Sequence, residues 1–355
     1  MWAATLLSMG AAAFGRLLVV NLMPSAILVL CGWITVRGAA IDRGNELTLM
    51  QALMLGHKVD TLPLLMAILL IAILAAMTQS FQLGFIRLLE GYWGSSRLGI
   101  ALAGWGVRRR ETYVTRLHDM QRVETQARNK LKPELADLSR RSAHVQRRLL
   151  RENRTAEIKL DSAISRLQTH YPPTGVPLLP TRLGNAMRSF EHRAGERYGY
   201  KTISTWPRLY HHLSERLTSS YTSSVDALHA AVNFTFAFAL SAVVLAVGFW
   251  DDPEVLWLPG ICLAATILAY RGALSAACMV GLMESVAYDL HRFDLLTGLR
   301  QKLPEDGTTE LADAEHISML LAQTDPEGAR AYVQGLKYEH KRADDGSGSS
   351  KPPES

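Results

Sequence analysis

The residues with the most evident chemical potential are two adjacent histidines, His211 and His212, followed by Glu215. On a helix, His211 and Glu215 lie four residues apart and share a face, an arrangement that suits a metal ion or acid–base chemistry. Two ligands do not close a zinc site, however, and the surrounding Lys and Arg side chains disfavour a cation. We therefore favour a solvated helix face here, and we predict no metal site and no cofactor.

No stronger catalytic pattern occurs elsewhere in the sequence, which has no Walker loop, no G-x-S-x-G nucleophile elbow and no H-E-x-x-H pair. The cysteines Cys31, Cys262 and Cys278 lack C-x-x-C spacing, so neither a zinc site nor a redox motif is indicated. A Cys31–Cys262 disulfide is geometrically conceivable, although we favour small packing residues. We predict that the protein is not an enzyme and has no catalytic residues.

Four apolar blocks stand apart from an otherwise polar chain: residues 17–36, 62–81, 228–249 and 256–282. Each reaches the length of about 20 residues that a helix needs to cross a hydrocarbon core about 30 Å thick. None alternates as a barrel strand would. The first block is long for a signal peptide and no A-x-A cleavage site follows it, so we favour a span. The sequence predicts an all-α integral membrane protein with four transmembrane helices in two hairpins.

Basic residues determine the predicted orientation. Residues 86–225 contain 25 of the 38 Lys and Arg residues against 12 Asp and Glu, and the short connection between the last two blocks carries acids only. Arg87, Arg97 and Arg108–Arg110 follow the second block directly, and positive charge near span ends marks the cytoplasmic side. We therefore expect an inner (plasma) membrane protein with both termini and a helical insert in the cytoplasm.

These features predict four regions: residues 1–93 with spans 1 and 2, a basic helical cytoplasmic domain at 94–225, residues 226–289 with spans 3 and 4, and an acidic tail at 290–355, disordered from about 343. Within the basic domain, apolar residues at three- and four-residue steps predict two helices, the second starting near Pro133. We expect an antiparallel or bent pair and leave a self-associating coiled coil open. Amphipathic helices are predicted at 45–60 and 310–323.

Four polar residues lie in the spans, toward their predicted cytoplasmic halves: Asn21, Gln79, Asn233 and Arg271. Polar side chains are costly in hydrocarbon, and they usually face the bundle interior or a water-filled path. They would either line a vestibule or pore, or form interhelical hydrogen bonds that fix packing and contribute about 0.6 kcal/mol each. We favour packing and keep an oligomeric channel or small-solute conduit as the alternative function.

The helix of the fourth span continues past Arg271, which we expect to mark the inner membrane boundary. Small residues then recur at four-residue steps: Ala273, Ala277, Gly281 and Ser285. Such a ridge is smooth and allows another helix to approach closely. The sequence leaves open whether this helix is the third span or belongs to another subunit.

The arginine-rich stretch 108–154 would suit nucleic acid or anionic lipid. Tyr113 is its only aromatic residue, which disfavours stacking on bases. We therefore expect anionic lipid headgroups and a protein partner or second copy, and no nucleic acid. A basic middle and an acidic tail on the same side of the membrane also favour docking of one on the other.

Three segments resemble a known group of proteins: FIRLLEGYW (85–93), LPTRLGNAMRSFEHRAGERYGY (179–200) with TWPRLY (205–210), and YDLHRFDLLTGLRQKLP (288–304). Together they resemble uncharacterised, mainly actinobacterial, multi-pass membrane proteins. The resemblance covers about half of the chain and implies four spans around a cytoplasmic insert, with nothing catalytic. The second segment supplies our candidate interaction surface, formed by Arg182, Arg188, Trp206, Arg208 and Tyr210. We expect its arginines to pair with Glu191, Glu196 or the acidic tail.

The function that these observations favour is a non-enzymatic multi-pass membrane protein. It would assemble with itself or bind a partner through its cytoplasmic helices, as a scaffold, a sensor or a membrane effector. This prediction rests on the helical insert, the opposed charges and the small-residue ridge.

Overall fold

The computed structural model describes residues 15–41, 61–137, 142–323, 325–334 and 338. These residues form helices and no β-strand, apart from one isolated bridge between Gln301 and Tyr338. The predicted all-α fold is therefore confirmed. The helix predicted at 45–60 and the disordered end predicted from about 343 lie outside the described residues.

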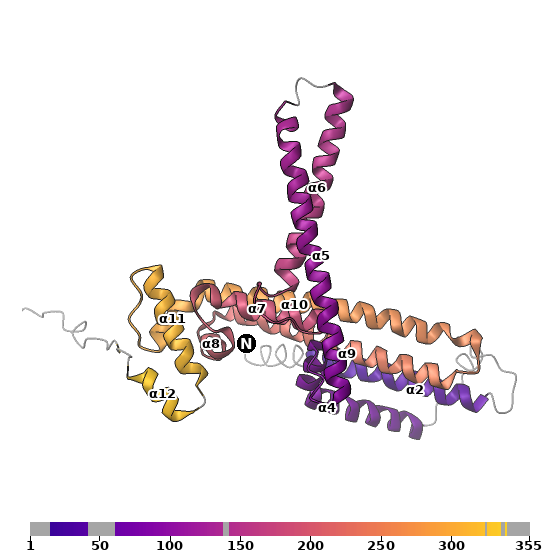
Figure 1. The fold of residues 1–355 in the computed structure, drawn as a ribbon. Helices are drawn as coiled ribbons and strands as arrows, with labels where there is room; N and C mark the ends of the chain where they lie inside the picture. The colour runs from indigo at the N-terminus through magenta and orange to yellow at the C-terminus, as the bar shows by residue number, and fades with distance from the viewer. Residues whose placement is uncertain (1–14, 42–60, 138–141, 324, 335–337, 339–355) are drawn as a thin grey trace, which may run out of the picture. The chain divides into compact units, whose positions relative to one another are not determined.

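The helical elements follow one another along the chain as Figure 1 labels them. They are η1 (Leu18–Leu22), α2 (Met23–Ile41), α4 (Thr61–Glu90), α5 (Arg97–Ala136), α6 (Ala143–His170), α7 (Arg182–Ala194), η3 (Glu196–Tyr198), α8 (Thr202–Leu209), η4 (Tyr210–His212), α9 (Glu215–Gly248), η5 (Pro253–Val255), α10 (Trp257–Gly298), α11 (Gly307–Ala322) and α12 (Pro326–Val333).

Four helical stretches among the described residues are long and apolar enough to cross a membrane: Gly15–Val36, Leu64–Glu90, Glu215–Gly248 and Trp257–Gly298. They coincide with the four apolar blocks of the sequence. The last two helices extend well beyond their apolar blocks, because α9 begins at Glu215 and α10 ends at Gly298. A helix needs hydrogen bonds and not apolar side chains to continue into water, so the end of an apolar block does not mark its end.

The density of contacts divides the chain into two compact units. The first unit contains the described residues up to Phe190 together with Ser220–Gly281, and the second contains Glu191–Ser219 and the described residues from Leu282 onward. A buried cluster of the first unit joins Ile86 of α4, Leu183 of α7 and Val232 of α9 to the small residues of α10. The second unit has its own core, formed by Ala194, Tyr200, Leu209, Leu217, Ala287, Tyr288, Leu295 and Ala314.

Helices α5 and α6 of the first unit lie side by side and antiparallel, as Figure 1 shows, and we call this pair the α5–α6 hairpin. At 40 residues, α5 is about 60 Å long. A narrow buried stripe joins the two helices, made of Leu117, Leu149, Ala156, Leu160 and Ala163. Two ion pairs connect them beside it, Arg128 with Glu157 at 3.5 Å and Lys159 with Glu124 at 3.4 Å.

The break between these two helices differs from the prediction. The sequence predicted a new helix near Pro133, but α5 continues through Pro133 to Ala136, and α6 begins only after Ser142. A proline removes one backbone hydrogen bond, and in the last turn of α5 that loss does not end the helix.

Candidate functional site

A pair of asparagines joins the first and third spans. The Nδ2 group of Asn233 in α9 donates hydrogen bonds to the carbonyl oxygen of Val20 at 2.8 Å and to Oδ1 of Asn21 at 3.2 Å. Asn233 is only 2% exposed and Asn21 is also buried. The pair therefore connects η1 with α9 inside the bundle.

Pro24 lies four residues after Val20, whose carbonyl accepts the hydrogen bond from Asn233. In an α-helix the carbonyl of residue 20 accepts from the N–H of residue 24, and proline has no N–H. The first span has a π-helical turn at Leu18–Leu22, directly before Pro24, and the amide of Asn233 supplies a donor there. In hydrocarbon no water is present to take that place. Asn233 therefore supplies a side-chain donor to the backbone of a neighbouring helix.

The other two polar residues of the predicted cluster do not join this pair. The side chains of Gln79 in α4 and Arg271 in α10 are exposed on the protein surface. The structure thus brings together Asn21 and Asn233 and leaves Gln79 and Arg271 apart.

The small-residue ridge packs within the chain. Ala273 and Ala277 are fully buried, in the cluster that also holds Leu228 and Val232 of α9. Gly281 lies so close to Phe190 that a Cβ atom there would overlap the ring. The ridge therefore receives side chains from α7 as well as from α9. Ser285, the last residue of the predicted ridge, is buried in the second unit.

The start of α7 is held by hydrogen bonds to two spans. The hydroxyl of Thr181 donates to the carbonyl of Glu90, the last residue of α4, at 2.9 Å. The N–H of Leu183 donates to the hydroxyl of Tyr270 in α10 at 3.2 Å. Gly184 approaches so closely that a Cβ atom would overlap the carbonyl oxygen of Glu90. The sequence analysis missed this connection.

An Asn185 clamp shapes the segment that precedes α7. Its Nδ2 donates to the carbonyls of Leu179 and Thr181, each at 2.6 Å, and its Oδ1 accepts from the N–H of Leu179 at 2.9 Å. Asn185 is fully buried. The signal that could have identified this face is the spacing of Leu183, Ala186, Phe190 and Ala194, at three- and four-residue steps.

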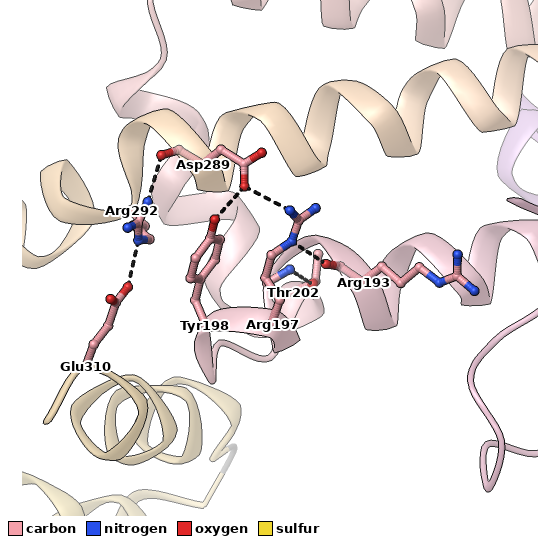
Figure 2. A network of polar contacts seen from close by, with 8 residues as sticks. Arg193, Arg197, Tyr198, Thr202, Asp289, Arg292 and Glu310 are labelled. Atoms are coloured by element: carbon pink, nitrogen blue, oxygen red, sulfur yellow. Dashed lines mark hydrogen bonds and ion pairs between the residues drawn. The ribbon is translucent and has the colours of Figure 1, made fainter. Parts of the chain in front are cut away.

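The second unit contains a network of charged and polar groups, shown in Figure 2. The hydroxyl of Tyr198 donates to Oδ1 of Asp289 at 2.7 Å, and Arg197 forms an ion pair with the same oxygen at 3.3 Å. Arg292 stacks over the Tyr198 ring at 4.2 Å and donates to Glu310 at 2.6 Å. The side chains of Arg292 and Glu310 are only 17% and 14% exposed. This pair therefore binds α11 to the end of α10.

Buried hydroxyl groups complete this connection. Those of Thr205 and Tyr288 share a hydrogen bond at 2.7 Å, and the hydroxyl of Ser318 in α11 accepts from the N–H of Lys201 at 2.9 Å. Gly199, two residues before Lys201, has a φ of +83°, which is the left-handed conformation that glycine adopts freely. Burial, followed by the charge of Glu310, raises the pKa of Tyr200 far above its usual range. The raised pKa keeps the Tyr200 hydroxyl protonated at neutral pH.

The predicted interaction surface is divided between the two units. In the first unit Arg182 stacks over the Tyr113 ring at 5.5 Å, and Arg188 donates to the carbonyl of Pro177 at 2.7 Å. In the second unit, Trp206 packs against Tyr210 and Tyr288, with ring centroids 6.2 Å apart in each case, and Arg208 donates to the carbonyl of Ser204 at 2.6 Å. The five residues therefore do not form one continuous surface within either unit.

The histidines and cysteines form no metal site in the described part of the chain, where no three His, Cys, Asp or Glu side chains could hold an ion together. His211, His212 and Glu215 are exposed. Cys31 and Cys262 lie in one buried cluster of the first unit, and both are free thiols.

Four helices of sufficient length and apolarity indicate a membrane protein. Comparison with protein-family models, curated proteins and solved structures finds no match for this chain. The resemblance to actinobacterial membrane proteins therefore stays a prediction.

Proposed function

We propose that this protein is a non-enzymatic multi-pass membrane scaffold that assembles with itself or with a protein partner through the α5–α6 hairpin. Its four spans hold the hairpin at the membrane, and we place the hairpin and both termini in the cytoplasm of a bacterial cell. The orientation follows from the basic residues that directly succeed the second span.

The observation that carries this proposal is the apolar surface that the hairpin leaves open. Val123 and Ile158 are 59% and 61% exposed. Val123 directly precedes Glu124 and Ile158 directly precedes Lys159, and these two charged residues form an ion pair. Val123 and Ile158 therefore lie at the same level on neighbouring helices. Leu150 and Met120 add further exposed apolar area along the hairpin. Apolar groups at matching positions on two helices are the usual anchors of a helical interface.

The charge of the hairpin adds selectivity to these anchors. Residues 97–170 contain 17 Lys and Arg against 8 Asp and Glu. A surface of one sign speeds association with a partner of the opposite sign and repels a partner of the same sign. The acidic tail of a second copy and an acidic surface on another protein both match it.

The alternative of a channel or conduit has no specific observation in its favour. Asn21 and Asn233 are buried against each other, and Gln79 and Arg271 are exposed and do not converge with them. Packing accounts for the two asparagines.

The test measures assembly of the full chain in lipid nanodiscs and in native membranes. The variant Val123→Ser with Ile158→Ser should lose an assembly that the wild type forms, as judged by particle mass. Ile203→Ser, which changes a still more exposed isoleucine of α8, is the control and should retain that assembly. A photo-crosslinking residue at position 123 should capture a second copy or one defined partner. A monomeric wild type without such a crosslink would refute the proposal.

A further inference from the structure

Three arginines gather where the α5–α6 hairpin meets α7 in the first unit. Arg166 of α6 donates to the hydroxyl of Tyr113 in α5 at 3.3 Å. Arg182, the first residue of α7, stacks over the ring of the same tyrosine at 5.5 Å. Arg110 of α5 donates to the carbonyl of Pro180 at 3.4 Å. Each arginine comes from a different helix, and all three surround one small region.

Two aromatic residues and a histidine form the floor of this arginine cluster. Tyr171 is 2% exposed and lies 6.0 Å from Tyr113, measured between ring centroids. The Nδ1 atom of His170 is buried and has no hydrogen-bond partner. Burial, and then the charges of Arg182 and Arg166, lower the pKa of His170. The electrostatic potential at His170 is therefore positive, and its buried Nδ1 atom lacks a hydrogen-bond partner there.

No carboxylate neutralises the cluster. Within the described residues, Arg110, Arg166 and Arg182 form no ion pair, whereas Arg128 further along the same hairpin pairs with Glu157. Their contacts are a hydroxyl, a ring face and a carbonyl, none of which carries a full negative charge. Three guanidinium groups so close together repel one another, and an anion between them would remove that repulsion.

The cluster lies at the end of the membrane spans. Thr181 and Leu183, on either side of Arg182, are bonded to the last residue of α4 and to Tyr270 of α10. Tyr92 and Trp93 directly follow α4, and such aromatic residues are enriched where spans meet the headgroups. These contacts hold Arg182 beside the last residue of α4, one of the helices that could cross a membrane.

The beginning of α5 supports the same placement. Its first three turns expose large apolar side chains, namely Leu98, Ile100, Leu102 and Trp105. The triplet Arg108–Arg110 follows immediately. Apolar groups followed by cations are typical of a helix whose first turns lie in the interface and whose cations reach lipid phosphates.

We propose that Arg110, Arg166 and Arg182 bind the phosphate of an anionic phospholipid headgroup. The guanidinium fork matches the geometry of phosphate oxygens and donates two hydrogen bonds to them. A lipid is the source that fits, because its acyl chains would lie along exposed apolar surface beside the cluster. A free phosphate shares the chemistry of the headgroup but gains nothing from that surface. The site does not depend on the assembly proposed above.

The experiment measures lipid binding to the purified full chain by native mass spectrometry, with phosphatidylglycerol and phosphatidylcholine as probes. Arg166→Gln with Arg182→Gln should weaken binding of phosphatidylglycerol by about 10- to 30-fold, from the contribution of two cations near a lipid surface. Arg151→Gln with Arg154→Gln removes the same charge from exposed positions of α6 and should change the binding of phosphatidylglycerol little. Equal losses in the two variants would refute the site.

Two further measurements test whether the guanidinium groups are needed in a folded variant and whether the ligand is a lipid headgroup or free phosphate. Arg166→Lys with Arg182→Lys keeps the charge but loses the fork, so it should bind with intermediate affinity and fold normally. Wild-type affinity in this variant would refute recognition by the guanidinium groups. Inorganic phosphate should raise the melting temperature of the wild type far less than phosphatidylglycerol at the same concentration. An equal shift would refute the headgroup as the ligand.

Discussion

Replacing Asn233 by leucine tests whether an amide of α9 completes the backbone of the first span. The change removes two hydrogen bonds, to the carbonyl of Val20 and to Asn21, and keeps a side chain of similar size. Interhelical hydrogen bonds in membranes contribute about 0.6 kcal/mol each on average, and a stranded buried acceptor adds a cost of about 1–3 kcal/mol. We expect Asn233→Leu to lower the free energy of unfolding by about 2–4 kcal/mol.

Pro24→Ala provides the decisive second change, because alanine restores the N–H that the carbonyl of Val20 otherwise lacks. In that background Asn233→Leu should be less costly by about 1 kcal/mol, which is the coupling free energy of the double-mutant cycle. The assay is unfolding of the full chain in mixed micelles by titration with sodium dodecyl sulfate, followed by circular dichroism.

Ser241→Ala is the matched control, since Ser241 is also buried in α9 and its hydroxyl oxygen has no hydrogen-bond partner. It should change the free energy of unfolding by less than about 0.5 kcal/mol. If Asn233→Leu has the same cost with proline and with alanine at position 24, the amide does not substitute for the missing donor. The explanation of the pair would then be wrong.

Three further predictions concern other parts of the fold. Gly184→Ala should destabilise the first unit by about 2 kcal/mol in thermal unfolding, because the added methyl group meets the carbonyl of Glu90. Gly104→Ala is the control, since it has open space around it and should be neutral or stabilising. Arg292→Met leaves the carboxylate of Glu310 without its ion-pair partner and should lower the free energy of unfolding by about 3 kcal/mol. The expected result is faster proteolysis of α11, which adding Glu310→Gln should partly reverse. The lowered pKa of His170 means that its neutral form stabilises the fold above the unfolded pKa of about 6.5, and this contribution is lost as pH falls toward the folded pKa. Unfolding of His170→Gln should therefore depend less than that of the wild type on pH below about 6.5. Unchanged proteolysis in the arginine variant, or unchanged pH dependence in the histidine variant, would contradict the respective prediction.

The four apolar helices could be predicted because a bilayer demands long apolar segments, whatever the rest of the fold does. The ends of α9 and α10 could not, since both helices continue through polar residues to Glu215 and Gly298. Hydropathy reports the solvent around a helix and not its hydrogen bonds.

The polar residues in the spans show a second limit. Asn21, Gln79, Asn233 and Arg271 give the same signal in the sequence, yet only the two asparagines meet. Whether a polar group faces the bundle or its surroundings depends on the rotation of its helix, which contacts between distant segments determine. Asn21 and Asn233 are 212 residues apart, and no local pattern links them.

The segment at 179–210 shows how a correct observation can lead to an incomplete interpretation. Its arginines indicated an exposed surface, and Arg182 is indeed exposed. The same helix, α7, buries Leu183, Asn185 and Ala186 completely. A short helix with one charged and one apolar face is a packing element whose charged side is left in solvent.

The contacts at the start of α7 also impose an order on how this protein is made. The carbonyl of Glu90, at the end of α4, accepts from the hydroxyl of Thr181, which is synthesised 91 residues later. The amide of Leu183 meets its acceptor, Tyr270, only after a further 87 residues have been synthesised. At a ribosomal rate of about 5–20 residues per second, the interval from Glu90 to Tyr270 lasts about 9–36 s. During the later part of that interval α7 has been synthesised, but the amide of Leu183 still lacks its partner in α10. A ribosome that stalls before Tyr270 therefore leaves the amide of Leu183 without the acceptor that it has in the finished chain.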